Sequence, residues 1–243
     1  NIGTGQILKA VIESCEKKQA PVILAIHPLE LEFQGDSFLR SCRAAANATR
    51  IPVTIHLDHG ANLGQIYHAI QTGFTSVMID ASHQPFEENI AICRQVVEIA
   101  HLLGISVEGE LGTIGTVGND AEGGTGEIIY TRPDDAVRFV AETGIDCLAV
   151  AIGTAHGIYP KGFKPELKLD LLSEIKAKVN IPLVLHGGSA NPDSEIAESV
   201  KRGINKINIS SDIKDAFYQQ LRKTLTADPH VREPFELYVD SIH

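Results

Sequence analysis

Seven short apolar runs, separated by longer segments of helical periodicity, constrain the fold of this chain more than any other feature. The runs are rich in valine, isoleucine and leucine, and they cover residues 21–26, 51–57, 76–79, 105–111, 147–152, 181–185 and 204–209. Near-continuous apolar strands are typical of parallel sheets whose two faces are both covered by helices. The alternation therefore predicts an α/β protein built on a parallel sheet.

The segments between the runs have the features of helices. Residues 36–46 begin at an N-cap candidate, and residues 133–142 begin with proline and two acidic residues, which a first helical turn prefers. Gly144 follows at a position typical of a helix C-terminus. We expect eight helices, of which the first covers about residues 4–18 and precedes the first strand.

A helix followed by seven strands suggests a (β/α)8 TIM barrel that lacks its first strand. Such barrels have about 250 residues, and this chain has 243. The sequence ends at residues 238–243 without a closing signal, so we expect the C-terminal segment to be truncated as well. No linker divides residues 1–243, which we interpret as one catalytic domain. A doubly wound open sheet is the alternative, although no GxGxxG motif follows a strand.

Composition excludes several classes of function. Lysine and arginine number 21 against 31 acidic residues, which gives a net charge of −10. Because phosphate backbones require a basic surface, we expect no nucleic-acid partner. No apolar run is long enough for a membrane span, and the first residues do not resemble a secretory signal. Four widely spaced cysteines without a CxxC pair favour free thiols, so we expect a cytoplasmic protein.

Histidines gather at the ends of the predicted strands. His59, His156 and His186 each stand directly beside a glycine at such an end. In a barrel these positions share the C-terminal rim, where active sites are built. Three imidazoles with one open position form the ligand set of a catalytic zinc. We therefore predict that these three residues bind one Zn²⁺, while for His27 and His83 a structural and a functional role both remain open.

Three carboxyl groups accompany these histidines. Asp58 precedes His59, and we expect it to face the barrel mouth as an acid, a base or an orienting group. The alternative is that Asp58 is only a hydrogen-bond partner of a metal-bound histidine. Asp80 and Glu110 each end a strand. They could hold a second, weaker metal position, or they could cap the strands or form ion pairs.

Small residues follow the last two strands, in the segments 187–189 and 208–212. Barrels frequently bind a phosphate at this place through loop amides and the start of a short helix. Glycines and hydroxyl residues suit an anion site that needs no basic surface, so we predict a phosphate there. Lys161 could add a positive charge, although a solvated lysine is the simpler interpretation.

One long loop is unusual in a compact domain. Residues 112–126 contain six glycines and almost no bulky side chains. A loop of this length is typical of a functional lid or of a disordered segment.

Six sequence blocks together resemble the class II, metal-dependent ketose-bisphosphate aldolases, which include the fructose-1,6- and tagatose-1,6-bisphosphate aldolases. The blocks occur in family order across nearly the whole chain, and their wording is closer to the tagatose branch. They are HLDH at 56–59, MIDASH at 78–83, VEGELG at 107–112, LAVAIGTAHG at 148–157, PLVLHGGS at 182–189 and KIN at 206–208.

The resemblance implies a role for each matching position. The reaction would be the reversible retro-aldol cleavage of a ketose 1,6-bisphosphate into dihydroxyacetone phosphate and glyceraldehyde 3-phosphate. Zinc would act as the Lewis acid, and Asp58 would exchange the proton of the C4 hydroxyl. Asp80 and Glu110 match an alternate or second zinc position. Dihydroxyacetone phosphate, often with a sodium or potassium ion near its phosphate, would be bound by Gly157, Gly187, Gly188, Ser189, Asn208, Ile209, Ser210 and Ser211.

The chain departs from the family pattern in its long loop. A family glutamate that moves the proton of dihydroxyacetone phosphate would fall at Gly118 or Asn119, so Asp120 and Glu122 become the candidate bases. The family also implies a homodimer or homotetramer. The alternatives are an aldolase for a different aldehyde, another metal-dependent barrel enzyme acting on sugar phosphates, and a non-catalytic homologue. The last of these should have lost a metal ligand, yet all three histidines remain.

Overall fold

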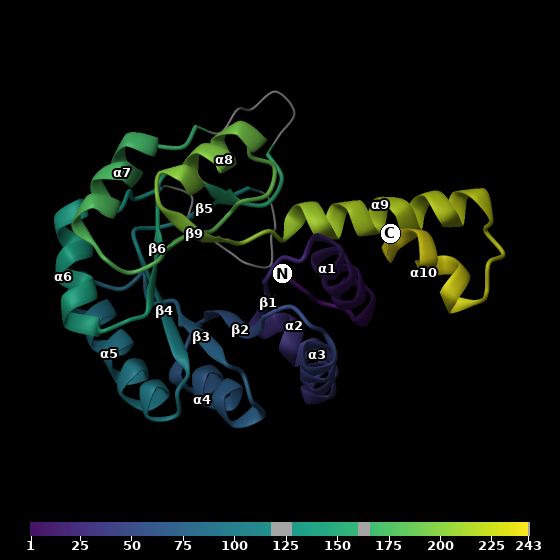
Figure 1. Ribbon diagram of the computed structural model, residues 1–243, viewed down its shortest axis with the longest axis horizontal. Helices are drawn as coiled ribbons and strands as arrows, with labels where there is room; N and C mark the ends of the chain where they lie inside the picture. Colours follow the sequence, from purple (N-terminus) through teal and green to yellow (C-terminus); the bar gives the residue numbers. More distant parts are fainter. Residues whose placement is uncertain (118–127, 160–165, 243) are drawn as a thin grey trace.

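A curled sheet of seven parallel strands forms the centre of the computed structural model, which describes residues 1–117, 128–159 and 166–242 (Figure 1). The spatial order of the strands, β1-β2-β3-β4-β6-β8-β9, follows their order in the chain, and all adjacent pairs are parallel. This is the arrangement of a TIM-like barrel, and it confirms the seven predicted strands. Their bounds are β1 Val22–Ile26, β2 Val53–Gly60, β3 Ser76–Ile79, β4 Ser106–Leu111, β6 Cys147–Val150, β8 Leu183–Leu185 and β9 Ile204–Ile207.

Helices connect the strands and cover the outer side of the sheet (Figure 1). The described residues contain ten helices, whereas eight were expected from the sequence. The helix expected at 133–142 is α6, and it ends at Gly144, whose φ of 72° is the left-handed cap that favours glycine. The bounds are α1 Gly5–Lys18, α2 Pro28–Gln34, α3 Asp36–Ala48, α4 Leu63–Thr72, α5 Phe86–Leu102, α6 Pro133–Thr143, α7 Leu169–Lys178, α8 Asp193–Lys201, α9 Ser211–Ala227 and α10 Pro234–Ile242.

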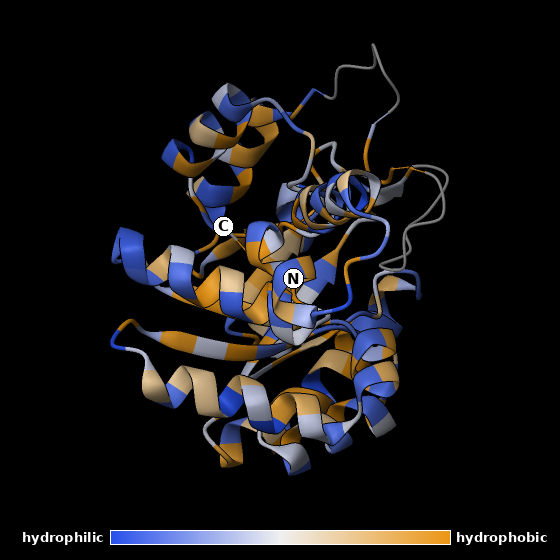
Figure 2. Ribbon diagram, turned by 90° about the vertical axis from the view of Figure 1, so that its right-hand side faces the viewer, coloured by the Kyte–Doolittle hydropathy of each residue, from blue (hydrophilic) through white to orange (hydrophobic). Residues whose placement is uncertain are grey.

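The core lies between the sheet and the surrounding helices. Strand β4 shows how the two faces differ, since alternate residues point to opposite sides. A Cβ built on Gly109 would lie 3.2 Å from Ile145 and from Phe139, which places this side of the strand against the helical layer. Glu108 and Glu110 therefore point to the inner side, and both are buried. In Figure 2 the helices carry both hydrophobic and hydrophilic residues, as amphipathic helices do.

A second, two-stranded sheet lies beyond the rim of the large one. It consists of β5 (Gly115–Thr116) and β7 (Ala155–His156), which pair in parallel. The amide of Val117 extends this pairing by donating to the carbonyl of His156 at 2.8 Å. Both strands have only two residues, too few for a hydrophobic pattern, so neither was predicted from the sequence. The pairing of β5 with β7 holds the backbone of His156 in place.

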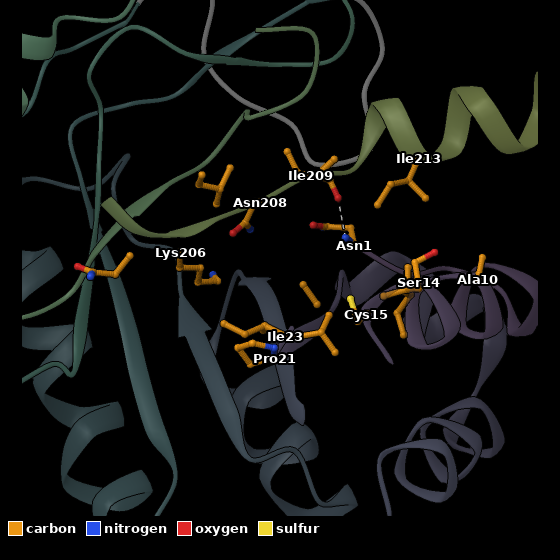
Figure 3. A pocket seen from close by; sticks show the side chains of 16 residues that line it. Asn1, Ala10, Ser14, Cys15, Pro21, Ile23, Lys206, Asn208, Ile209 and Ile213 are labelled. Atoms are coloured by element: carbon orange, nitrogen blue, oxygen red, sulfur yellow. Dashed lines mark hydrogen bonds between the residues drawn. The ribbon is translucent and has the colours of Figure 1, made fainter. Parts of the chain in front are cut away.

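The sheet is open between β1 and β9, which are its two outer strands. Asn1 and Ile2 reach both sides of this interval, because the terminal amine of Asn1 donates to the Ile209 carbonyl and the Ile2 amide donates to the Ala25 carbonyl. A groove of about 540 Å³ remains here. Figure 3 shows the groove, with Lys206 on the β9 side.

The last two helices extend away from the sheet (Figure 1). Helix α10 returns along α9, and the rings of Phe217 and Tyr238 stack between them with centroids 6.2 Å apart. The sequence showed no closing signal at residues 238–243, and in the structure residues 234–242 form helix α10. None of the described helices has the length and apolar character needed to cross a membrane. All four cysteines are free thiols, as predicted, and two of them are fully buried.

Candidate metal centre and surrounding residues

Three predicted ligands come together above the inner side of the sheet. His59 is the last-but-one residue of β2, His156 ends β7, and His186 follows β8; all three are buried. One ring nitrogen from each lies within 4.8 Å of one from either other residue. The ring centroid of His59 is 5.0 Å from that of His156 and 4.6 Å from that of His186. Neutral imidazoles at this spacing can share one divalent cation.

The orientation of His59 depends on its backbone and on Asp80. The φ angle of His59 is 48°, a left-handed conformation that few residues other than glycine adopt. Its Nδ1 lies 2.8 Å from Asp80 Oδ2, and its buried Nε2 has no hydrogen-bond partner. Burial lowers the pKa of His59, but Asp58, Asp80 and Glu110 outweigh it and raise this pKa to about 10. The ring is therefore protonated near neutral pH, and a cation that binds Nε2 would have to displace the proton there.

Asp58 is the predicted catalytic carboxylate, and it is completely buried beside His59. Asn208 Nδ2 donates to one of its oxygens at 3.0 Å, and Asn1 Nδ2 donates to the other at 2.5 Å. Burial raises the pKa of Asp58, but electrostatic interactions, led by the one with His59 and including the Lys206 charge, outweigh burial and hold this pKa well below its usual range. The group is therefore an anion held in place by hydrogen bonds, as an orienting group or a proton acceptor must be.

A second group of possible ligands shares His59 with the first. Ligand atoms of His59, Asp80 and Glu110 also lie within 4.8 Å of one another. Asp80 is anchored by Ser82, whose amide and hydroxyl both donate to Oδ1. Burial and the Asp80 charge raise the pKa of Glu110 well above its usual range. An added cation would favour its ionised form, so the arrangement suits an alternate metal position.

The predicted phosphate-binding segments lie side by side. The Gly188 amide donates to the Asn208 carbonyl at 3.0 Å, and the amides of Ser210 and Asp212 both lie 3.2 Å from Ser189 Oγ. These contacts place Gly187, Gly188 and Ser189 against Asn208, Ile209, Ser210 and Ser211 at the start of α9. The start of a helix presents backbone amides and favours an anion.

Gly157 directly follows His156 and has a φ of 103°. A Cβ at this position would lie 2.4 Å from the Val117 carbonyl oxygen. Only glycine therefore allows β7 to approach the chain after β5 this closely.

Other residues singled out in the sequence fall at different places. His27 is buried at the end of β1, with its ring centroid 6.5 Å from that of His59, whereas His83 is exposed. The candidate bases Asp120 and Glu122 lie outside the described residues, as does Lys161.

One part of the site was not predicted from the sequence, the ionic contact of Glu108 with Lys206. Glu108 Oε2 accepts from Lys206 Nζ at 2.7 Å, and Glu108 Oε1 lies 2.7 Å from His186 Nε2. The sequence nevertheless contains one indication of this contact for each of the two residues. Glu108 has the same strand parity as Glu110, and Lys206 is the only lysine in the seven apolar runs.

The family model for class II fructose-bisphosphate aldolases matches residues 1–242, nearly the whole chain. The chain belongs to this family. It is accordingly an enzyme, an aldolase of class II, and the resemblance found in the sequence blocks is confirmed. Members of the family are lyases of carbohydrate metabolism, and the group of three histidines described above is a possible metal site within it.

Two curated relatives within the family are about equally similar to this chain. The tagatose-1,6-bisphosphate aldolase subunit GatY of Klebsiella oxytoca is 40% identical over 235 residues, covering 96% of this chain and 82% of the relative. The fructose-bisphosphate aldolase of Geobacillus stearothermophilus is 41% identical over 239 residues, with the same coverage of 96% and 82%.

Solved structures show the same fold. The YdjI aldolase of Escherichia coli K12 has a TM-score of 0.84 at 31% identity, over 100% of this chain and 83% of that one. A putative fructose-1,6-bisphosphate aldolase of Coccidioides immitis has a TM-score of 0.86 at 28% identity, over 99% and 84%.

Proposed function

We propose that this chain is a zinc-dependent aldolase that cleaves tagatose or fructose 1,6-bisphosphate reversibly into dihydroxyacetone phosphate and glyceraldehyde 3-phosphate. The observation that carries the proposal is the convergence of His59, His156 and His186, with nitrogens within 4.8 Å, next to the buried carboxylate of Asp58. Similarity to a tagatose and to a fructose bisphosphate aldolase at 40% and 41% identity supports this class of substrate.

The donor set of the site fits zinc. Three imidazoles with a carboxylate nearby are a common set for a catalytic zinc with an open position. The buried Nε2 of His59, which makes no hydrogen bond, is a donor that a metal would satisfy. His59, His156 and His186 would hold Zn²⁺, and Asp80 and Glu110 would hold an alternate or second ion together with His59. When bound, zinc supplies a Lewis acid for the negative charge that develops beside the ketone.

In the cleavage direction, Asp58 removes the proton of the C4 hydroxyl as the carbon–carbon bond breaks. Its two hydrogen bonds, from Asn208 and Asn1, keep the carboxylate in one orientation, and its lowered pKa keeps it ionised. Asp120 or Glu122 then returns a proton to the dihydroxyacetone phosphate carbanion. The reverse reaction uses the same groups in the opposite order.

The phosphate of dihydroxyacetone phosphate binds the segments after β8 and β9, through residues 187–189 and 208–211, together with Gly157. The start of α9 and the glycine amides supply donors, so the site suits an anion although the chain has a net charge of −10. A sodium or potassium ion near the phosphate would balance its charge. We also propose that residues 1–243 form one catalytic domain, which acts in the cytoplasm as a homodimer or homotetramer.

A coupled assay on a panel of ketose bisphosphates tests the proposal. Activity should disappear with a chelator and return with zinc, whereas borohydride added with substrate should not inactivate, because no Schiff base forms. Cleavage of tagatose or fructose 1,6-bisphosphate above the other sugars is the expected result. Full activity in a metal-free preparation would contradict zinc dependence. If only another ketose phosphate were cleaved, the aldehyde product would differ from glyceraldehyde 3-phosphate.

A further inference from the structure

Buried polar contacts connect His186, which follows β8, to side chains on β4 and β9. Glu108 on β4 lies 2.7 Å from His186 Nε2 through Oε1 and accepts from Lys206 Nζ on β9 at 2.7 Å through Oε2. The side chains of Glu108 and His186 are 1% and 0% exposed. Strands β4 and β9 are not neighbours in the sheet, so Glu108 spans the interior to reach both partners.

Two contacts assign the same proton position to the His186 ring. An ionised carboxylate can only accept, so the nitrogen facing Glu108 has to be Nε2–H. On the other side of the ring, Asn208 Nδ2 lies 3.3 Å from Nδ1 while it also donates to Asp58 Oδ1 at 3.0 Å. An amide nitrogen has two hydrogens, so it can serve both acceptors. Nδ1 is therefore the nitrogen of His186 that keeps a lone pair.

Lys206 maintains the charge on Glu108. Its side chain is only 11% exposed, along the groove between β1 and β9 in Figure 3. Besides Glu108 it meets His56 Nε2 at 3.4 Å, and the other nitrogen of His56 is engaged with Ser76 at 2.8 Å. The ammonium group of Lys206 is therefore the cationic partner of the buried Glu108 carboxylate, 2.7 Å from its Oε2.

We propose that Glu108 and Lys206 are positioning residues that fix the Nε2–H form of His186 and so present Nδ1 to a divalent cation shared with His59 and His156. The inference rests on the proposed metal site. Carboxylate partners of metal-binding histidines typically account for about 10–100-fold in metal affinity. Lys206 thus acts on the site through Glu108, without touching substrate.

Nitrogen-15 NMR of the metal-free protein tests the ring form directly. Two-bond couplings distinguish the two neutral forms of a histidine, and a His186→Gln variant identifies the signals of this residue. We expect Nε2–H in the wild type and a larger Nδ1–H fraction in Glu108→Ala. A wild type in the Nδ1–H form, or an unchanged ring form in Glu108→Ala, overturns the proposal.

Competition with a zinc-binding dye measures the consequence for the cation. Zinc affinity should fall about 10–100-fold in Glu108→Gln and should also fall in Lys206→Met. Asp36→Asn is the matched control, because Asp36 on α3 pairs with His68 on α4 at 3.0 Å, where both side chains are about half exposed, and this variant should keep wild-type affinity. Urea unfolding of each variant reports whether a loss of affinity merely follows a loss of stability.

The double variant Glu108→Gln with Lys206→Met separates positioning from a purely structural role. A neutral pair in place of a buried ion pair often restores stability, so its urea midpoint should lie above those of the single variants. Its zinc affinity should stay low, because His186 still lacks an anionic partner. If the double variant or Glu108→Gln keeps wild-type zinc affinity, the positioning role is overturned while the proposed metal site still stands. A wild type that binds no zinc overturns the proposed function and this inference together.

Discussion

Gly157→Ala tests how closely the chain after β5 must approach β7 to place His156. Gly157 has a φ of 103°, which costs an L-residue roughly 1–3 kcal/mol. A Cβ here would lie 2.4 Å from the Val117 carbonyl oxygen, a backbone atom that cannot rotate away. Overpacking of this kind costs roughly 1–3 kcal/mol more. We therefore expect a loss of about 2–6 kcal/mol in the free energy of unfolding.

Substitutions at two other glycines separate the backbone strain from the overpacking. Gly104 has a φ of 70°, and a Cβ added to it would have nothing within 4 Å, so Gly104→Ala measures backbone strain alone, roughly 1–2 kcal/mol. Gly5 has neither an unusual φ nor a neighbour within 4 Å, and Gly5→Ala should change stability by less than about 1 kcal/mol.

Urea unfolding of the metal-free variants gives the three free energies, and dye competition gives the zinc affinity of each. Separation of β5 from β7 would move His156, because the Val117 amide donates to its carbonyl at 2.8 Å. Zinc affinity should therefore fall in Gly157→Ala and remain unchanged in Gly104→Ala and Gly5→Ala. If Gly157→Ala were no less stable than Gly104→Ala, the close approach of the backbones would not constrain this position.

Three other predictions concern the site, the core and the thiols. Asp58→Asn should retain zinc but lose about 10²–10⁴ in kcat, since it cannot accept the hydroxyl proton; wild-type turnover would remove Asp58 from the proton transfer. Phe139→Ala should lower the free energy of unfolding by about 3–5 kcal/mol, because this ring is fully buried, and a loss below about 1 kcal/mol would contradict tight packing there. Burial raises the pKa of Cys42 and of Cys93 to about 12, so both thiols stay protonated at pH 8. A thiol reagent at this pH should modify the half-buried Cys15 before either of them, and rapid modification of all three would show that the interior opens readily.

The strands and their functional ends were predictable because one physical cause produces both. Strands that are covered on both faces are largely apolar, so β6 and β8 appear as continuous runs in the sequence. Parallel strands in sequential order bring their carboxyl ends to one rim, which is why His59, His156 and His186 could be grouped before any geometry was known.

The rest depends on contacts that leave little local signal. The pairing of β5 with β7 involves two residues on each side, and helix α10 is held mainly by packing on α9 through Phe217 and Tyr238. The contact between Glu108 and Lys206 joins residues 98 positions apart. A charged residue inside an apolar run shows that a partner is required, but neither propensity nor spacing identifies which one.

The left-handed backbone at His59 has a consequence for how this protein would respond to engineering. A φ of 48° costs an ordinary L-residue about 1–2 kcal/mol, and glycine or asparagine would adopt it with less strain. Replacement of the imidazole would relieve this strain, but it would leave the carboxylates of Asp58 and Asp80 without their positive partner. Because strain and charge act in opposite directions at this residue, melting temperature does not report on the ligand, and any campaign for heat tolerance has to score turnover as well.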